Sequence, residues 1–490
     1  MLPFGQLGAL WNRIIQRGAA SGMTETQFLE AEIRRFLDSP ERRDMLTGAM
    51  YYKGEQEICR KRREMIGEGG KRTAVYNLPN NRLIDNQYAK LVDQKANYLL
   101  AKPIDAKPED GAPAAYGDAL ADAFDRAFCR RLKNVGKDAL NGGIAYLVPY
   151  IDDSGLQFKR LPPYQVMPLW ADDEHTAMDA AIRIYPVMVY EGQTATTVHK
   201  VEYYTPEGLR HYVWKAGTLI PDTEETDAAY VTIEGHPFNW ERLPVIAFKA
   251  NADEIPLIIR IKSLQDALNE LTSNFADGMM EDVRSSVLVL YNYDGTDLGE
   301  FRRNLATMGA IKIRRDNDLH GGVEVLHIDV NADNYKTITQ HIKRAIIENG
   351  RGFDSKDERF SAGNVNQMNI QSAFADIDLD ADEMEAEFQA SLHKVLWFVN
   401  TYLAAKGIQA SGNVIFTFNR DTMVNTSEQI ANAKNSMGVI SKETIVANHP
   451  WTKDTDEELA RLKRAQEESM QRFDQMGAGF IRQNNGGTGE

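Results

Sequence analysis

The 490-residue sequence has little cysteine and no long apolar run. Its two cysteines, Cys59 and Cys129, lack CxxC spacing, so we expect reduced, part-buried thiols and neither a disulfide nor a metal site. No apolar segment is long enough to span a bilayer, and the N-terminus lacks a convincing signal peptide. These absences predict a soluble, intracellular protein.

Basic residues are also in deficit, with 56 Lys and Arg against 71 Asp and Glu and a net charge of −15. Proteins that grip DNA gain affinity when Lys and Arg displace counterions from phosphates, so this composition argues against a general or sequence-specific DNA binder. Two interpretations stay open. The acids could simply solubilise the surface, or they could line a conduit along which DNA slides without being trapped.

Catalytic signatures are missing as well. The nine histidines are scattered and form no metal cluster with Cys or Asp, and there is no nucleophile elbow. The segment GEGGK at residues 67–71 resembles a phosphate-binding loop, but Met65 replaces the first glycine of that motif and Arg72 its metal-binding hydroxyl residue. We therefore predict no enzyme activity, no nucleotide site and no cofactor.

An alternating acidic run near residue 380 invites comparison with a calcium-binding loop. Its carboxylates are Asp376, Asp378, Asp380, Asp382 and Glu387. Ala381 stands where such a loop needs glycine for a sharp turn, and the surrounding pattern predicts a helix. We predict no metal site here; the acids cover a solvated helix face or form charge pairs at a subunit interface.

Residues 253–351 hold the most informative pattern, two periodic helices that bracket a small insert. After Pro256 apolar residues recur at helical spacing as far as Phe275, which predicts a helix from Leu257 to about Val283. The apolar stripe is narrow, so we expect neighbouring subunits to cover much of the rest. The partner helix is marked by Tyr335, Ile338, Ile342 and Ile346. In the insert between these helices, the sequence pattern predicts strands at 286–293, 310–315 and 323–330 and a helix at 298–308.

Helices are predicted to open the chain, with a capping box at Thr24 and a second start at Ser39-Pro40. A basic segment, residues 60–72, follows. Further helices are predicted over 81–101, 118–131 and 137–140. Alternating strands then predict an antiparallel meander, at 144–151, 156–160, 165–170, 181–189, 198–204, 209–214 and 245–250. Its aromatic residues are interpreted as core or subunit-interface packing and not as a base-stacking platform.

The last part of the chain begins with an irregular stretch, residues 350–367, which is long enough to predict a functional loop, with a solvated surface loop as the alternative. A long helix, a strand at 414–418 and helices starting near Thr426, Ser441 and Asp454 follow. From Gly477 the composition predicts a frayed tail.

The order of these pieces resembles that of portal proteins, the ring-shaped head-to-tail connectors of tailed double-stranded DNA bacteriophages. The resemblance rests on NNRLIDNQYAKLVDQKANYLLAKPI from Asn80, ERLPVIAFKAN from Glu241, the helix pair with its insert, and the segments that begin at Asn364 and Ile415. It implies an α+β, mainly helical portal fold with wing, stem, clip and crown. The implied regions are 1–252 wing, 253–284 stem helix, 285–331 clip, 332–350 second stem helix, 351–367 tunnel loop, 368–425 long helix and return strand to the wing, 426–476 crown and 477–490 flexible tail.

The same resemblance implies a ring of commonly twelve subunits at the capsid portal vertex of the virion, assembled in the host cytoplasm, through which DNA is packaged and ejected. The implied partners are the terminase large subunit, tail adaptor proteins, and major capsid and scaffolding proteins. The predicted DNA-contacting residues of the tunnel loop are Arg351, Lys356 and Arg359, with Gly350, Gly352 and Gly363 giving the loop flexibility. The predicted motor- or adaptor-binding bases of the clip are Arg302, Arg303, Lys312, Arg314 and Arg315. The alternative is another phage head protein, such as a minor head protein or tail adaptor.

Overall fold

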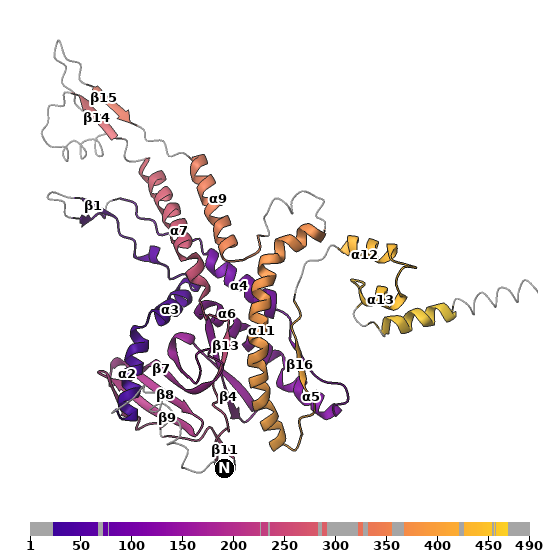
Figure 1. The fold of residues 1–490 in the computed structure, drawn as a ribbon. Helices are drawn as coiled ribbons and strands as arrows, with labels where there is room; N and C mark the ends of the chain where they lie inside the picture. Colours follow the sequence, from indigo (N-terminus) through magenta and orange to yellow (C-terminus); the bar gives the residue numbers. More distant parts are fainter. Residues whose placement is uncertain are drawn as a thin grey trace, which may run out of the picture. The chain divides into compact units, whose positions relative to one another are not determined.

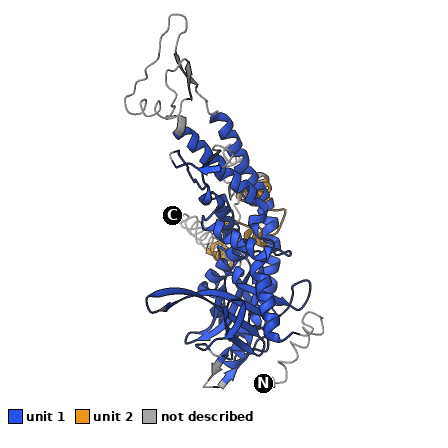
Figure 2. Cartoon of the chain, turned by 90° about the vertical axis from the view of Figure 1, so that its left-hand side faces the viewer, with its two compact units in different colours: residues 1–353, 376–421 blue, residues 354–375, 422–490 orange. Residues whose placement is uncertain are grey.

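The computed structural model divides the chain into two compact units (Figure 2). Unit 1 comprises residues 1–353 and 376–421, and unit 2 comprises residues 354–375 and 422–490. Both helices and sheets occur, in agreement with the predicted α+β class. The described residues are 23–66, 72–76, 78–225, 227–233, 236–282, 287–291, 322–326, 332–354, 367–420, 426–452, 455 and 457–468.

Two helices with the predicted caps open the described part of unit 1. At the start of α2 (Glu25–Asp38), the Gln27 N–H donates to Thr24 Oγ1 at 3.2 Å and the Thr24 N–H donates to Gln27 Oε1 at 3.0 Å, which completes the capping box. Ser39 caps α3 (Pro40–Tyr52), whose first residue is proline. The buried residues of α2, which pack against the larger sheet, are Phe28, Leu29 and Ile33.

The larger sheet is antiparallel, in the order β10-β9-β8-β7-β6 (Figure 1), and contains the middle strands of the predicted meander. The prediction of one meander over 144–250 is wrong, because the strands at 144–151, 156–160 and 245–250 pair with one another in a second sheet. Its strands are β6 (Val166–Trp170), β7 (Met178–Glu191), β8 (Thr194–Thr205), β9 (Gly208–Lys215) and β10 (Thr218–Pro221). The short edge strand β10 was not predicted. Tyr203 and Tyr204 are 1% and 4% exposed, which confirms the packing interpretation for these two, whereas Tyr190 is 68% exposed.

A second sheet, in the order β13-β4-β5, packs with helices in the main core of unit 1. The elements are β4 (Ile144–Asp152), β5 (Gly155–Leu161), β13 (Ile246–Lys249), α4 (Gln87–Leu100), α5 (Ala114–Ala123) and α6 (Arg126–Gly142). The prediction of a single helix over 118–131 is wrong, because helix α5 ends at Ala123, with Phe124 as its C-terminal cap. Asp125 accepts a hydrogen bond from the Phe128 N–H at 2.7 Å and so starts α6 as a new helix.

Short elements fill the connections of unit 1. They are η2 (Glu57–Arg60), β1 (Glu64–Ile66), β2 (Arg72–Ala74), η4 (Pro163–Gln165), β11 (Val231–Ile233) and β12 (His236–Phe238). Strands β1 and β2 form an antiparallel hairpin. Both cysteines are free thiols. The prediction of partial burial is confirmed for Cys129 and wrong for Cys59, which is exposed. The loop at 67–71, from which the sequence excludes a nucleotide site, lies outside the described residues.

The predicted helix pair is confirmed by α7 and α9, which run side by side (Figure 1). Phe275 of α7 stacks on Tyr335 of α9 with ring centroids 3.8 Å apart. Between the two helices in the chain, two strands pair antiparallel. The bounds are α7 (Leu257–Asp282), β14 (Val287–Tyr291), β15 (Gly322–Leu326) and α9 (Ala332–Asn349). The strand predicted at 310–315 and the helix predicted at 298–308 lie outside the described residues.

A row of polar side chains on α7 holds an extended segment, residues 81–86, where the sequence predicts a helix. That prediction is wrong over these residues, because side chains of α7 bind the backbone and keep it extended before α4 begins at Gln87. The bonds are Asn81 N–H to Asp277 at 2.6 Å, Leu83 N–H to Ser273 at 2.9 Å, Asp85 N–H to Asn269 at 3.0 Å and Tyr88 N–H to Gln265 at 3.1 Å. We call these four α7 residues the polar row.

Geometry explains the regular pairing. The polar row has a spacing of four residues, about 6 Å along a helix, and the bound residues 81, 83 and 85 alternate along an extended chain at about 6.6 Å. Gln265, Asn269 and Ser273 are fully buried, and Asp277 is 4% exposed. Part of the α7 surface on which the sequence predicts a neighbouring subunit is therefore covered by this chain itself.

The long helix α11 (Gln367–Ala405) extends over 39 residues and contributes to the core of unit 1. Its fully buried apolar residues include Phe388, Leu392 and Val395. After α11, β16 (Val414–Thr417) confirms the predicted strand and pairs antiparallel with β3 (Asp105–Pro108). Segments about 300 residues apart in the sequence are thus joined in one small sheet.

Unit 2 contains helices where the sequence predicts them. They are α12 (Thr426–Asn435), α13 (Lys442–Ala447) and the helical residues 457–468. Ser441 caps α13 by accepting a hydrogen bond from the Thr444 N–H at 3.2 Å. The predicted tail from Gly477 lies outside the described residues. Across the described parts of both units, no helix combines the length and apolar character that a membrane crossing requires.

Candidate functional site

The candidate site is the junction where α9 ends and the predicted tunnel loop begins. The Gly350 N–H donates to Ile346 O at 2.9 Å and the Gly352 N–H donates to Ile347 O at 2.8 Å, which closes the last turn. Between them Arg351 has a φ of 48°. This left-handed conformation usually belongs to glycine at a helix end and costs another residue roughly 1 kcal/mol. Contacts beyond the turn must therefore hold Arg351 in place.

Helix α4 supplies the first of these contacts. The Gln94 side-chain amide binds both backbone groups of Phe353, accepting from its N–H at 3.0 Å and donating to its carbonyl at 2.7 Å. Phe353 is 8% exposed. A Cβ atom on either Gly350 or Gly352 would collide with Leu91 of α4. These two glycines allow a close approach to α4, so the first residues of the segment are fixed.

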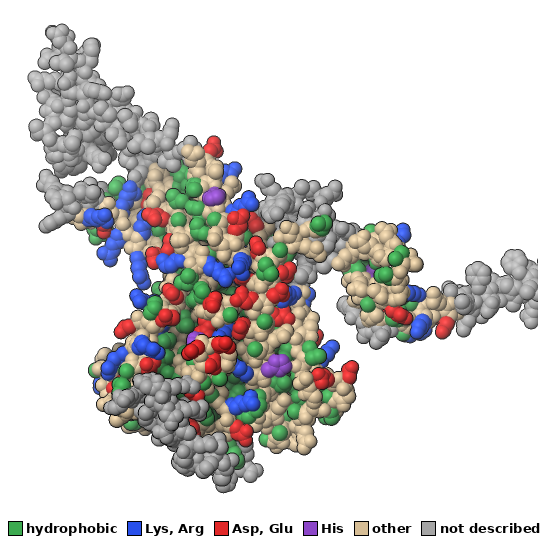
Figure 3. Space-filling model, in the orientation of Figure 1, with side chains coloured by type: hydrophobic (Ala, Val, Ile, Leu, Met, Phe, Trp, Pro, Cys, Tyr) green, Lys and Arg blue, Asp and Glu red, His purple; other side chains and the backbone are tan. Residues whose placement is uncertain are grey.

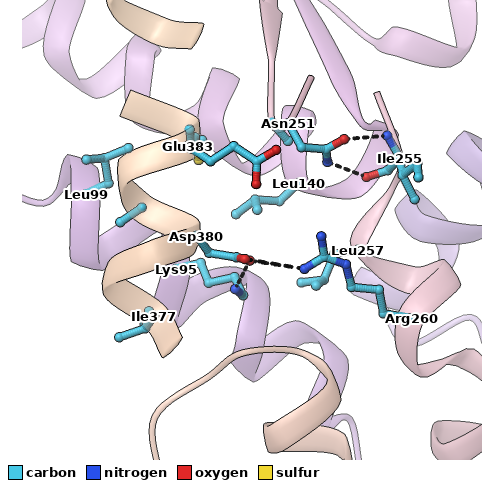
Figure 4. Close-up of a pocket in the computed structure, with 13 residues that line it drawn as sticks. Lys95, Leu99, Leu140, Asn251, Ile255, Leu257, Arg260, Ile377, Asp380 and Glu383 are labelled. Atoms are coloured by element: carbon cyan, nitrogen blue, oxygen red, sulfur yellow. Dashed lines mark hydrogen bonds and ion pairs between the residues drawn. The ribbon is translucent and has the colours of Figure 1, made fainter. Parts of the chain in front are cut away.

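Asp380 of α11 is the centre of the second contact, a cluster with three cations, of which Figure 4 shows Lys95 and Arg260. Its carboxylate lies 2.5 Å from Lys95 Nζ, 2.8 Å from the Arg351 guanidinium and 3.3 Å from the Arg260 guanidinium. Lys95 also donates to the Arg351 carbonyl at 3.0 Å. One carboxylate therefore joins α4, α7, α11 and the residue at which α9 turns into the loop.

Burial and charge act in opposite directions in this cluster. Burial alone would raise the pKa of Asp380, but Lys95 and Arg351, with Arg260, hold that pKa below its usual range. Burial lowers the pKa of Lys95, and the attraction of Asp380 offsets part of this effect. The side chains of Lys95 and Asp380 are 5% and 15% exposed, whereas that of Arg351 is 47% exposed. Arg351 can thus meet solvent while it stays paired.

Two other carboxylates of the acidic run, Asp378 and Asp382, also bind a base of this chain. Arg420 lies 2.6 Å from Asp382, 2.5 Å from Glu385 and 3.7 Å from Asp378, which in turn accepts a hydrogen bond from Tyr98. Among the described residues no group of three or more His, Cys, Asp or Glu side chains could hold a metal ion. Neither alternative that the sequence leaves for this run describes Asp378, Asp380 and Asp382, because these carboxylates pair with bases of this chain itself.

Comparison with known proteins decides the family. The family model described as phage portal protein, SPP1 Gp6-like, matches residues 38–472. This chain belongs to that portal family. It is 28% identical to the portal protein of Bacillus phage SPP1 over 454 residues, which cover 91% of this chain and 87% of the relative. It is 25% identical to the portal protein of Clostridium phage phiCD119 over 432 residues, or 86% and 92% of the two chains. The predicted resemblance is confirmed.

The site residues predicted for this portal chain are only partly covered by the structure. Arg351, Gly350 and Gly352 lie at the junction. Lys356, Arg359 and Gly363 lie outside the described residues, as do the clip bases Arg302, Arg303, Lys312, Arg314 and Arg315. Contact of Arg351 with DNA stays a prediction, and the structure adds that its guanidinium is bound to Asp380.

Sequence reasoning missed Lys95, Gln94 and Arg260 as partners of the portal's loop junction. A signal for Lys95 was present, because this residue lies on the face of α4 that carries the buried Leu91, Val92 and Leu99. A lysine that is buried on an apolar face needs an acidic partner. The sequence does not tell which of the many carboxylates supplies it, since Asp380 lies 285 residues away.

Proposed function

We propose that the chain forms a closed ring of twelve subunits at the capsid portal vertex of a phage virion, with a central channel through which double-stranded DNA is packaged and ejected. The terminase large subunit docks on the ring during packaging and tail adaptor proteins dock afterwards, while major capsid and scaffolding proteins surround it. The chain acts as a conduit and has no ATPase activity of its own. Membership of the portal family supports this proposal.

The domain assignment follows the order of elements along the chain. We assign residues 1–252 to the wing, and α7 and α9, within 253–284 and 332–350, to the stem. Residues 285–331, which hold β14 and β15, form the clip, and residues 351–367 form the tunnel loop. Residues 368–425 hold the long helix and return strand, 426–476 the crown and 477–490 the tail.

One observation carries the proposal most directly. The segment after α9 leaves from a junction that is fixed by Gln94, Asp380 and Lys95 on α4 and α11. A loop that acts on passing DNA must be held at its base, because force on its tip would otherwise move the whole segment. The anchored base supports the assignment of residues 351–367 as the tunnel loop.

The ring is tested by negative-stain images of the purified full-length protein together with its mass in solution. We expect annular particles with a central hole wide enough for a duplex of about 20 Å. A chain that stays monomeric in every condition, and also in particles, would overturn the proposal. Particles with a ring of another subunit number would correct only the stoichiometry.

The tunnel-loop assignment predicts that replacing Arg351, Lys356 and Arg359 by alanine lowers the amount of packaged or retained DNA while rings still form. Each phosphate contact contributes a weak attraction that salt screens, so the difference between the variant and the parent should shrink as the ionic strength rises. The measurement is the length of protected DNA in particles assembled with each variant.

Because Arg351 also belongs to the Asp380 cluster, the double variant Lys356→Ala with Arg359→Ala is the matched control that leaves the junction intact. A defect in both variants supports contact between the loop and DNA. If particles of both the triple and the double variant contain full-length DNA, the loop bases do not act on DNA during packaging or retention.

A further inference from the structure

The basic segment at residues 60–72 belongs to an arm that has no role in the proposed function. The arm comprises residues 60–66, 72–76 and 78–82 and includes the β1–β2 hairpin (Figure 1). Six bases and one acid, Glu64, lie in these residues, in a chain whose acids outnumber its bases by 71 to 56. The six bases are Arg60, Lys61, Arg62, Arg63, Arg72 and Arg82. Figure 3 shows Lys and Arg side chains gathered over this part of the molecule.

The arm is held firmly on α7. Lys61 lies 2.9 Å from Asp277, the last residue of the polar row, and donates to Asn274 at 2.7 Å. The Lys61 carbonyl accepts from the Arg82 guanidinium at 3.1 Å, and Arg63 donates to the Pro79 carbonyl at 2.9 Å. Three of the bases, Lys61, Arg63 and Arg82, thus hold the arm in place. Arg60, Arg62 and Arg72 are exposed, and Arg72 also lies 3.9 Å from Glu64 of the same hairpin.

Large apolar side chains lie exposed beside these bases. Their exposed fractions are 93% for Tyr76, 37% for Leu78, 42% for Leu83, 38% for Ile84, 53% for Met279 and 54% for Met280. Met280 adjoins the arm, because the Asn81 side-chain amide lies 3.4 Å from its sulfur. Apolar groups next to outward-facing charge are typical of a protein interface, since a phosphate backbone offers nothing for them to pack against.

The direction of the arm also argues against DNA as its binding partner. Phe275 faces α9, whereas Asp277, two residues further along, faces the arm. Two residues turn a helix by about 200°, so the arm and α9 lie on nearly opposite sides of α7. In the proposed function α9 continues into the loop that faces the DNA. The arm then does not face the DNA.

We propose that the basic arm docks on an acidic surface of a second copy of this chain, the neighbouring subunit of the ring. This inference rests on the ring of the proposed function. A ring is built from heterologous contacts, in which one face of each copy meets a different face of the next. The excess of acids over bases in this chain favours an acidic face on the next copy that complements the exposed bases of the arm and their apolar neighbours.

The test reverses the three exposed charges in the full-length protein, as Arg60→Glu, Arg62→Glu and Arg72→Glu. We expect this variant to be monomeric at a salt concentration at which the parent is assembled, as measured by mass in solution. The matched control reverses three exposed bases elsewhere in unit 1, Lys107, Arg126 and Arg130. It carries the same change in net charge and should assemble like the parent.

A second measurement avoids any effect of charge reversal on folding. The variant Arg62→Lys keeps the charge and introduces an amine that a carbodiimide couples to carboxylates. Rings are made from a mixture of ¹⁵N-labelled and unlabelled chains, and cross-linked peptides are identified by mass. We expect links that join Lys at position 62 of one chain to an acidic peptide of the other isotope.

Three results would overturn the inference. They are an arm-reversed variant that assembles with the salt resistance of the parent, cross-links from position 62 that stay within one chain, or loss of DNA affinity with ring assembly intact. In each of these cases the ring of the proposed function still stands. A parent that never assembles would overturn both.

Discussion

Replacement of Asp380 by alanine is expected to lower the free energy of unfolding by about 3–5 kcal/mol, because removing one partner of a buried ion pair leaves the other charge uncompensated. Lys95 is 5% exposed and would lose its carboxylate, and Arg260 and Arg351 would be left facing it. The measurement is the denaturant midpoint at a fixed protein concentration, since the stability of an oligomer depends on concentration.

The neighbouring variant Asp382→Ala is the control for this prediction. Asp382 also pairs with an arginine, at 2.6 Å, but its side chain is 65% exposed. Exposed pairs contribute about 0–1 kcal/mol, so we expect a small change. Equal losses of unfolding free energy in the two variants would show that burial of the Asp380 cluster does not increase its contribution to stability.

The depressed pKa of Asp380 gives the effect a pH dependence. Its stabilising contribution is complete above the unfolded-state pKa of about 3.9 and is lost as the pH falls through the lower folded-state pKa. The stability difference between the parent and the Asp380→Ala variant should therefore shrink below pH ~4 and stay constant at neutral pH.

Deletion of the clip is the second change with a large expected effect. Replacing residues 285–331 by a short glycine-serine turn should abolish DNA packaging by the terminase motor, because the proposed docking surface for the motor is removed. The helix pair should survive, since Phe275 and Tyr335 stack directly and the buried Ile342 and Ile346 of α9 lie outside the deletion. Strands β14 and β15 pair with each other, so neither is left without its partner.

A matched variant separates the shape of the clip from its charge. It keeps the clip and replaces its predicted docking bases Arg302, Arg303, Lys312, Arg314 and Arg315 by alanine. Reduced packaging in this variant and none in the deletion would support docking through these bases. Normal packaging by the deletion variant, with rings intact, would remove the clip from the motor interface.

Periodicity in the sequence was sufficient to predict the elements that bury one continuous face. The helix at Leu257–Asp282 was predicted to within a residue of its end, because its apolar residues recur at helical spacing over about five turns, from Leu257 to Phe275. The meander followed from alternation between regularly spaced turns. In both cases the signal is local, because the spacing of apolar residues within a short stretch of sequence decides which side chains are buried.

The junction and the extended segment at 81–86 could not be predicted in this way. Residues 81–86 read as helix because Ile84 continues the apolar spacing of α4, and the side chains that keep them extended belong to α7, about 190 residues later. Polar residues at 265, 269, 273 and 277 form a repeat of four that could have suggested a bound segment. Which segment they bind depends on tertiary packing, as does the pairing of Lys95 with Asp380.

The polar row also restricts how the lengths of two distant parts of the chain can change in evolution. Inserting or deleting one residue of α7 between Gln265 and Asp277 would turn every later member of the row by about 100° away from the segment that it binds. On the extended side, a shift by one residue would point the paired N–H groups to the opposite edge. Side-chain identities here can drift wherever a polar atom is kept, but insertions and deletions in either part require a compensating change in the other.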